Sequence, residues 1–174
     1  MSEELQVTLR EAIPDDAAAL IEVMKQLAEE TDFLIMDQPA LEMTLEMMAL
    51  NLAALYESPN NCLFIAFVNG KIVGLASIKA SDDYRVAHIG EVGISLLKDY
   101  WGFGLGSLLM EELILWAEEG QLLRRLELTV QVRNQRAIHL YEKMGFEKEA
   151  TIARGARSED GAFLDVYLMR LFIN

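Results

Sequence analysis

The sequence predicts an α+β fold in which a mixed, mainly antiparallel central sheet is flanked by helices. Three observations predict it: apolar residues at helical spacing after Pro14, a β pattern from Cys62 to Leu97, and two later helices that each follow a strand. The 174 residues contain no internal repeat and no linker rich in Pro, Gly or Ser. We therefore expect a single domain over residues 1–174.

The first third of the chain is expected to form one strand and two helices. Val7 to Glu11 indicates a strand, and Pro14, at a first helical position and followed by two acids, opens a helix. Residues 31–37 break the helical pattern, and Pro39 opens a second helix over residues 43–56. The apolar face of the first helix is formed by Leu20, Val23, Met24 and Leu27.

The middle of the chain is expected to be β. Cys62 to Val68 is an apolar strand, and Asn69-Gly70 is the strongest short signal for a hairpin. Lys71 to Lys79 is its partner strand. After a turn at Asp82-Asp83, a long strand is expected from about Arg85 to Leu97.

The last third of the chain alternates strands and helices. A helix is expected from Gly104 to Glu119, followed by an alternating strand from Leu126 to Val132. Asn134 is expected to cap a helix that runs to Met144. Two closing strands surround a turn at residues 158–161, the last of them from Phe163 to Phe172. The predicted order is β-α-α-β-β-β-α-β-α-β-β.

Composition and charge exclude several classes of protein. No apolar run approaches the roughly 18 residues of a membrane span, and the acidic N-terminus does not resemble a secretory signal. The net charge of −13 argues against nucleic-acid binding, which needs clustered Lys and Arg. With Cys62 as the single cysteine, no internal disulfide is possible, and we expect a cytoplasmic protein that binds neither membranes nor nucleic acids.

The acidic charge is unevenly distributed along the chain. Residues 1–97 hold 16 acidic and 5 basic side chains, whereas residues 98–148 hold 8 and 7. A polyanionic ligand is repelled least by the middle segment, and a cationic substrate is attracted most by the N-terminal half. A solvated acidic surface that keeps the protein soluble explains the same counts.

A glycine loop lies between the long strand and the helix that follows it. Its residues are Trp101, Gly102, Phe103, Gly104, Leu105, Gly106 and Ser107. Glycine permits positive φ and close backbone approach, and the helix N-terminus adds about half a positive charge, so the loop suits a pyrophosphate although it contains no cationic side chain. A dinucleotide loop requires Gly or Ala where Leu109 stands, and a Walker loop requires Gly-Lys-Ser/Thr.

A second motif follows, with key positions Asn134, Ala137, Tyr141, Gly145 and Phe146. Together with the glycine loop, it resembles the GNAT superfamily of acetyl-CoA-dependent N-acetyltransferases. That family's cofactor loop is written Arg/Gln-x-x-Gly-x-Gly/Ala, its later segment reads Asn-x-x-Ala-x-x-x-Tyr-x-x-x-Gly-Phe, and its element order is the one predicted above. Trp101 occupies the Arg/Gln position. It either packs against the cofactor or covers the loop, so we expect binding to depend mainly on backbone donors.

The resemblance implies direct transfer of an acetyl group from acetyl-CoA to an amine. It implies that the backbone of Ile94 and Leu96 pairs with the pantetheine arm and that the loop amides hold the pyrophosphate. The helical spacing places Asn134, Ala137 and Tyr141 on one face, toward the cofactor. The phenol of Tyr141, with an ordinary pKa of about 10, is then the acid that protonates the leaving thiolate, whereas without the resemblance a tyrosine here is more simply a core residue.

Glu91 is the candidate base that takes a proton from the amine, directly or through a water. It lies in the long strand between two glycines, where close approach of a ligand is plausible. A solvent-facing or lysine-paired glutamate explains the same position equally well, and His88 is the rival base. His139 is expected to be exposed, and Cys62 to be a small core residue rather than an acyl carrier.

The acceptor is expected to bind near the N-terminal helices, the segment 31–37 and the turn at Gly161. Acidic residues in this region suit a cationic amine, and polyamines, amino acids, antibiotics and protein N-termini all remain open. The resemblance permits a homodimer, and no metal site is expected. The alternative function is a non-catalytic acyl-CoA-binding module that keeps the loop but has no working base.

Overall fold

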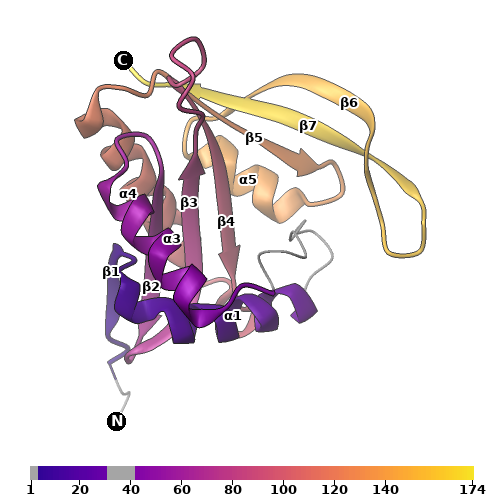
Figure 1. The fold of residues 1–174 in the computed structure, drawn as a ribbon. Helices are drawn as coiled ribbons and strands as arrows, with labels where there is room; N and C mark the ends of the chain where they lie inside the picture. Colours follow the sequence, from indigo (N-terminus) through magenta and orange to yellow (C-terminus); the bar gives the residue numbers. More distant parts are fainter. Residues whose placement is uncertain (1–3, 31–41) are drawn as a thin grey trace.

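The computed structural model describes residues 4–30 and 42–174 and is built on a seven-stranded sheet with the strand order β1-β2-β3-β4-β5-β7-β6 (Figure 1). All neighbouring strands are antiparallel except β4 and β5, which are parallel. The predicted fold class and element order are therefore confirmed. The elements are β1 (Val7–Glu11), the 3-10 helix η1 (Pro14–Asp16), α1 (Ala17–Glu30), α3 (Leu45–Glu57), β2 (Cys62–Val68), β3 (Lys71–Lys79), β4 (Ile89–Leu96), the 3-10 helix η2 (Lys98–Tyr100), α4 (Leu105–Gly120), β5 (Arg125–Gln131), α5 (Gln135–Lys143), β6 (Glu147–Arg157) and β7 (Phe163–Phe172).

The hairpin of β2 and β3 forms as the sequence predicts. Asn69 and Gly70 have φ values of 50° and 81°, which is the pair of left-handed residues that a tight two-residue hairpin requires. The N–H of Asn69 donates to the carbonyl of Gln6 at 2.9 Å, so the turn also holds the chain just before β1. The turn at Asn69 thus links the pairing of β1 with β2 to the pairing of β2 with β3.

β4 begins four residues later than predicted, at Ile89 rather than near Arg85. The reason is local: the carboxylate of Asp83 accepts a hydrogen bond from the backbone N–H of Arg85 at 3.0 Å and binds its guanidinium at 2.9 Å. This side-chain turn competes with extension of the strand. Asp83 therefore fixes where the strand leading to the glycine loop begins.

The start of α3 and the end of α4 also differ from the prediction. α3 begins after Thr44, whose hydroxyl accepts from the N–H of Met47 at 3.2 Å as an N-cap, while Pro39 lies outside the described residues. Gly120 is the last residue of α4, and the following Gln121 takes the left-handed conformation at φ 57°. A left-handed residue after a helix is usually glycine, which is why the sequence suggests an earlier end.

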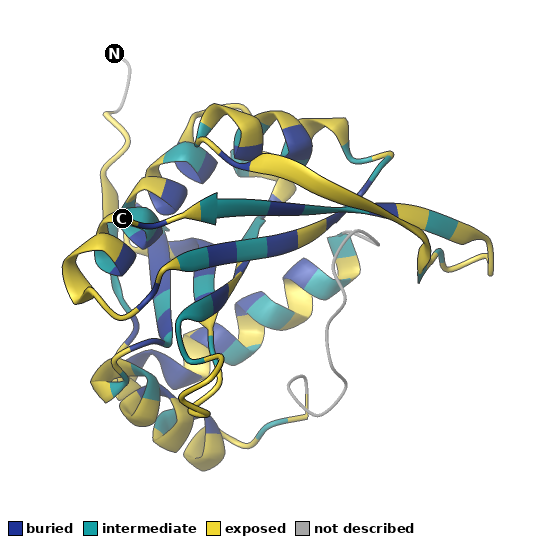
Figure 2. Cartoon of the chain, turned by 90° about the horizontal axis from the view of Figure 1, so that it is seen from above, coloured by how far each residue is buried: buried dark blue, intermediate teal, exposed yellow. Residues whose placement is uncertain are grey.

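The helices form layers on the two faces of the sheet. In Figure 1, α1 and α3 lie in front of the sheet, where they pack on β3 and β2, and α4 lies behind it. On the α4 side, Gly74 of β3 leaves room for Leu109, whose Cδ1 lies 3.2 Å from the position of a Cβ on Gly74. Figure 2 shows the inward faces of the helices buried, whereas the hairpin of β6 and β7 projects from the body with most of its residues exposed.

An ion pair between the half-buried Arg10 and the buried Asp16 stabilises the junction of β1 and the first helical turn. Asp16 is 8% exposed and accepts from both guanidinium nitrogens of Arg10 at 2.8 Å and from the N–H of Ile13 at 2.8 Å. The hydrogen bond from Arg10 is the main reason that the pKa of the Asp16 carboxyl lies below its ordinary value. The ionised carboxylate therefore stabilises the folded state.

Asp16→Asn is expected to lower the free energy of unfolding at pH 7 by about 2 kcal/mol, because it removes charge-assisted hydrogen bonds but keeps an acceptor for Ile13. The pKa of Asp16 is lowered by folding, so this contribution is complete above the unfolded value of about 3.9 and is lost as the pH falls through the folded pKa. Urea unfolding at a series of pH values checks it. Asp15→Asn, at an exposed neighbour, is the control, and a difference between wild type and Asp16→Asn that persists at low pH would contradict the assignment.

Candidate active site

The candidate site lies where β4 and β5 separate. These parallel strands pair over only three positions, Ile89–Glu91 with Arg125–Glu127. β4 then continues to Leu96 and β5 to Gln131, and Figure 1 shows their ends diverging. Beyond Glu91, the edge of β4 that faces β5 has no strand partner among the described residues. Since a strand edge presents N–H and C=O groups, this stretch offers backbone hydrogen bonds to an extended ligand arm.

The glycine loop follows β4 through η2, and its three glycines have different roles. Gly102 and Gly104 have φ values of 84° and 80°, which favour glycine, and no atom lies within 4 Å of a Cβ at either position. Gly106 is helical and buried, and a Cβ there would lie 3.1 Å from Leu140 Cδ2. Two glycines thus shape an open loop, and the third allows α4 to pack closely on α5.

The loop leads into the N-terminus of α4, which no side chain of the described residues caps. Gly104 occupies the N-cap of α4 and has no side chain to accept the first N–H groups. Phe103 is 66% exposed, whereas the Leu105 side chain is buried in the core, which leaves only the backbone of Leu105 for a ligand. The hydroxyl of Ser107 accepts from Lys143 Nζ at 3.3 Å. Free amides and the helix dipole together suit an anion here.

Trp101 is held between β4 and α5. Its indole N–H donates to the carbonyl of Leu96 at 2.9 Å, and the guanidinium carbon of Arg136 lies 3.8 Å from its ring centre. Lys98 Nζ lies 6.0 Å from the same ring. Although the loop itself contains no cation, neighbouring elements bring positive charges to it.

Sequence reasoning missed these cations, although a signal for two of them was present. Arg136, Leu140 and Lys143 follow i, i+4, i+7 spacing and form one stripe of α5. Their contacts are with Trp101, Gly106 and Ser107 in turn. The stripe therefore runs along the glycine loop.

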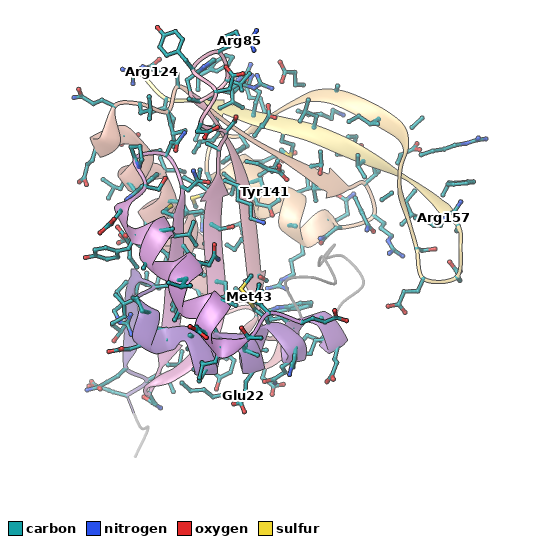
Figure 3. The ribbon with its side chains drawn as sticks, viewed as in Figure 1. Glu22, Met43, Arg85, Arg124, Tyr141 and Arg157 are labelled. Atoms are coloured by element: carbon teal, nitrogen blue, oxygen red, sulfur yellow. The ribbon has the colours of Figure 1, made fainter. Side chains whose placement is uncertain are left out.

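Tyr141 lies on α5 close to the sheet, as Figure 3 shows. It is 8% exposed, and its ring packs on Phe146 with the ring centres 6.0 Å apart. Burial raises the pKa of the phenol to about 12. Its hydroxyl makes no hydrogen bond within the described residues, yet no fully enclosed polar side-chain atom of that part of the chain lacks a partner. The hydroxyl oxygen must therefore reach accessible space.

Asn134 caps α5 as predicted, since its Oδ1 accepts from the N–H of Ala137 at 3.3 Å. Both residues are partly buried. On β4, the side chains of Ile94 and Leu96 point toward α4, because their Cδ1 atoms lie 3.9 and 3.6 Å from the position of a Cβ on Gly106. These four residues thus lie around the separated strands and the loop, near where the sequence places the cofactor.

Glu91 occupies the last paired position before the strands separate. Since side chains alternate along a strand, it lies on the sheet face opposite Ile94 and Leu96. It is exposed and makes no hydrogen bond or ion pair with any residue in 4–30 or 42–174. The residue beside it on β5, Glu127, is instead bound by Arg125 Nε at 2.7 Å.

His88 precedes β4 at the closed end of the paired strands. Its carbonyl accepts from the N–H groups of Arg124 and Arg125, at 2.9 and 3.1 Å. At about 3.3 Å per residue, it lies roughly 26 Å from Leu96 along the strand, farther from the loop than Glu91. Of the two candidate bases, Glu91 therefore lies nearer than His88 to the place where β4 and β5 separate.

The remaining candidates are placed as expected where the structure describes them. Cys62 is buried in the core, and burial raises the pKa of its thiol to about 12, which does not suit an acyl carrier. His139 is exposed on α5, and Gly161 lies in the turn between β6 and β7 with φ 88°. The predicted acceptor segment 31–37 lies outside the described residues.

Within residues 4–30 and 42–174, no helix combines the length and apolarity needed to cross a membrane. The same ranges contain no group of three or more His, Cys, Asp or Glu side chains arranged to hold a metal ion.

A glycine loop that opens a helix, beside a parallel strand pair that separates, places this protein among the acyl-CoA-dependent acetyltransferases. The chain belongs to the acetyltransferase (GNAT) family, whose model matches residues 21–146. It is an N-acetyltransferase that uses acetyl-CoA as its acetyl donor.

Individual relatives match nearly the whole chain. It is 29% identical, over 164 residues, to L-amino acid N-acetyltransferase AaaT of Escherichia coli (strain K12), covering 94% of this chain and 96% of that one. A GNAT-family acetyltransferase from Streptococcus pneumoniae is 47% identical, with a TM-score of 0.93 and coverage of 97% and 100%. A putative acetyltransferase from Salmonella typhimurium, solved with acetyl-CoA, shares the fold at 22% identity, with a TM-score of 0.80 and coverage of 97% and 94%.

Proposed function

We propose that the protein transfers the acetyl group of acetyl-CoA directly to a primary amine of a small molecule or a peptide. The observation that most supports this proposal is the separation of β4 from β5. The free edge of β4 leads through η2 and the glycine loop to the N-terminus of α4. Backbone groups along this continuous surface can then bind both the pantetheine arm and the pyrophosphate of the cofactor. The backbone of Ile94 and Leu96 binds the pantetheine arm, and the amides of residues 102–107 bind the pyrophosphate.

Tyr141 is the group proposed to act on the leaving sulfur. Its pKa of about 12 keeps the phenol protonated at neutral pH. Because an ordinary thiol has a pKa of about 8.5, complete proton transfer from this phenol to a thiolate is uphill. We therefore assign to Tyr141 a hydrogen bond that stabilises the charge developing on sulfur, while Asn134 and Ala137 hold the first turn of its helix.

Glu91 is the proposed base for the incoming amine. A lysine-like amine has a pKa of about 10.4, so it arrives as ammonium and must lose a proton before it attacks. Glu91 lies at the fork, the point where β4 and β5 stop pairing, on the sheet face opposite α4. The described residues provide it with no partner that would occupy its carboxylate. In this arrangement the amine approaches from the Glu91 face and the sulfur leaves toward α5.

Glu91→Gln is expected to lower kcat by about 10²-fold at neutral pH, at the lower end of the usual range for a base, because water competes at an exposed site. Glu127→Gln is the matched control, because Glu127 occupies the adjacent register position but is bound to Arg125. Equal losses in the two variants would argue against Glu91 as the base.

A panel of primary amines tests the proposed reaction, with release of the cofactor thiol as the readout. L-amino acids are tested first, because the relative AaaT is an L-amino acid N-acetyltransferase. Polyamines and peptide N-termini follow. We expect turnover above the rate of thioester hydrolysis with at least one class. Binding of acetyl-CoA without turnover on any amine would instead favour a non-catalytic acyl-CoA-binding module.

A further inference from the structure

The stack of Arg136 on Trp101 is not explained by the stability of α5. Arg136 lies in the first turn of the helix, where the helix dipole disfavours a positive charge. No carboxylate of residues 4–30 or 42–174 pairs with it, and none of its five N–H donors has a hydrogen-bond acceptor in those ranges. Among the described residues, the guanidinium therefore contacts only the indole face, and its N–H donors have no acceptor there.

Trp101 is well suited to fix such a group. Its indole N–H is anchored to the carbonyl of Leu96, at the last residue of β4 and next to the glycine loop. The ring is thus fixed relative to Gly102 and to the N-terminus of α4. A planar guanidinium stacked at 3.8 Å loses side-chain freedom before any ligand arrives, which favours binding of an anion. Arg136 is exposed as a residue, but the partial loss of water around its guanidinium lowers its pKa.

The position of Arg136 also bears on the difference between this chain and the family pattern at residue 101. The GNAT cofactor loop begins with Arg or Gln at this position, whereas this chain has Trp101 there. Leu140 and Lys143, farther along the same stripe, pack on Gly106 and Ser107. The stripe therefore brings the Arg136 end of α5 to the start of the loop and the Lys143 end to the first turn of α4.

We propose that Arg136, positioned by Trp101, binds a phosphate of acetyl-CoA at the glycine loop. It thereby replaces the Arg or Gln side chain that the family has at position 101. This inference rests on the proposed function, which places the pyrophosphate at residues 102–107. Trp101 is the positioning residue and Arg136 the binding residue. The shared chemistry is a phosphate oxyanion accepting paired N–H donors, from either the pyrophosphate or the 3′-phosphate of the cofactor.

The test compares Arg136→Ala with wild type using three acetyl donors. Calorimetry gives the Kd of acetyl-CoA and of acetyl-dephospho-CoA, which lacks the 3′-phosphate. The value of kcat/KM for S-acetylpantetheine, which lacks every phosphate, is measured by thiol release. We expect Arg136→Ala to weaken acetyl-CoA binding about 10- to 100-fold and to leave kcat/KM for S-acetylpantetheine unchanged. A smaller effect on acetyl-dephospho-CoA assigns the contact to the 3′-phosphate, and an equal effect assigns it to the pyrophosphate.

Two further variants separate binding from packing. Arg136→Lys keeps the charge but not the planar fork, so it should recover part of the affinity. Arg157 stacks on Phe163 at 4.7 Å near the tip of the projecting hairpin (Figure 3), so Arg157→Ala removes a similar stack without touching the loop and should leave the Kd unchanged. Unchanged acetyl-CoA affinity in Arg136→Ala, or an equal loss with S-acetylpantetheine, overturns the proposal. Failure of the wild type itself to bind acetyl-CoA would instead overturn the proposed function.

Discussion

Tyr141→Phe is expected to lower kcat by about 10²- to 10³-fold, the usual cost of losing one donor to developing charge. The Kd of acetyl-CoA should change by less than about threefold, since the interaction strengthens only as the C–S bond breaks. The variant removes a single oxygen from a ring that remains packed on Phe146. Pre-steady-state measurement of acetyl transfer, together with calorimetry, separates the two quantities.

The pH dependence provides a second readout of the same residue. Because burial raises the pKa of Tyr141 to about 12, the phenol stays protonated throughout the neutral and mildly alkaline range. The wild-type kcat should therefore show no fall from deprotonation of this phenol below about pH 11.

Tyr167→Phe is the matched control, at a half-buried tyrosine on β7 whose ring lies against Lys148. It should leave kcat unchanged. If Tyr141→Phe weakens acetyl-CoA binding as much as it lowers kcat, Tyr141 is a packing residue and its proposed role is wrong.

Gly104→Val is expected to abolish measurable binding of acetyl-CoA while the protein stays folded. The φ of 80° at Gly104 is costly for any L residue, by about 1–2 kcal/mol, and more so for a β-branched one. The loop can relieve this strain only by changing the backbone that aims its amides. No atom lies within 4 Å of a Cβ at this position, so the core does not clash with the new side chain. The measurement is the rise in Tm caused by acetyl-CoA, which should disappear.

Gly70→Val isolates the effect of strain from that of binding. Gly70 has nearly the same φ, 81°, and the same open space, but lies in the hairpin turn between β2 and β3. It should lower the Tm of the free protein about as much as Gly104→Val does and keep the full response to acetyl-CoA. A normal response in Gly104→Val would show that the loop does not hold the cofactor.

Local signals predicted much of the fold. The turn at Asn69-Gly70, the cap at Asn134 and the two strands beside the hairpin depend on neighbouring residues, and the structure confirms them. Arg85 is an exception. Its β pattern is favourable, but hydrogen bonds to Asp83 keep it out of the strand.

The site is only partly readable from the sequence because its geometry depends on long-range packing. The glycine spacing indicates an anion loop, but the different role of Gly106 becomes visible only through Leu140, 34 residues later. The contact of Arg136 with Trp101 spans 35 residues and follows from the same packing of α5 on α4. Likewise, the fork at Glu91 depends on where β5 stops pairing, which no local pattern in β4 encodes.

A crystal structure of the protein with acetyl-CoA is the most direct test of the central claim, that the fork and the glycine loop hold the acetyl donor and present its sulfur to Tyr141. We expect pyrophosphate oxygens within about 3.2 Å of backbone N–H groups in residues 102–107, and the thioester sulfur within about 3.5 Å of the Tyr141 hydroxyl. A cofactor bound away from the loop, or a sulfur too far from Tyr141 for a direct or single-water contact, would contradict it.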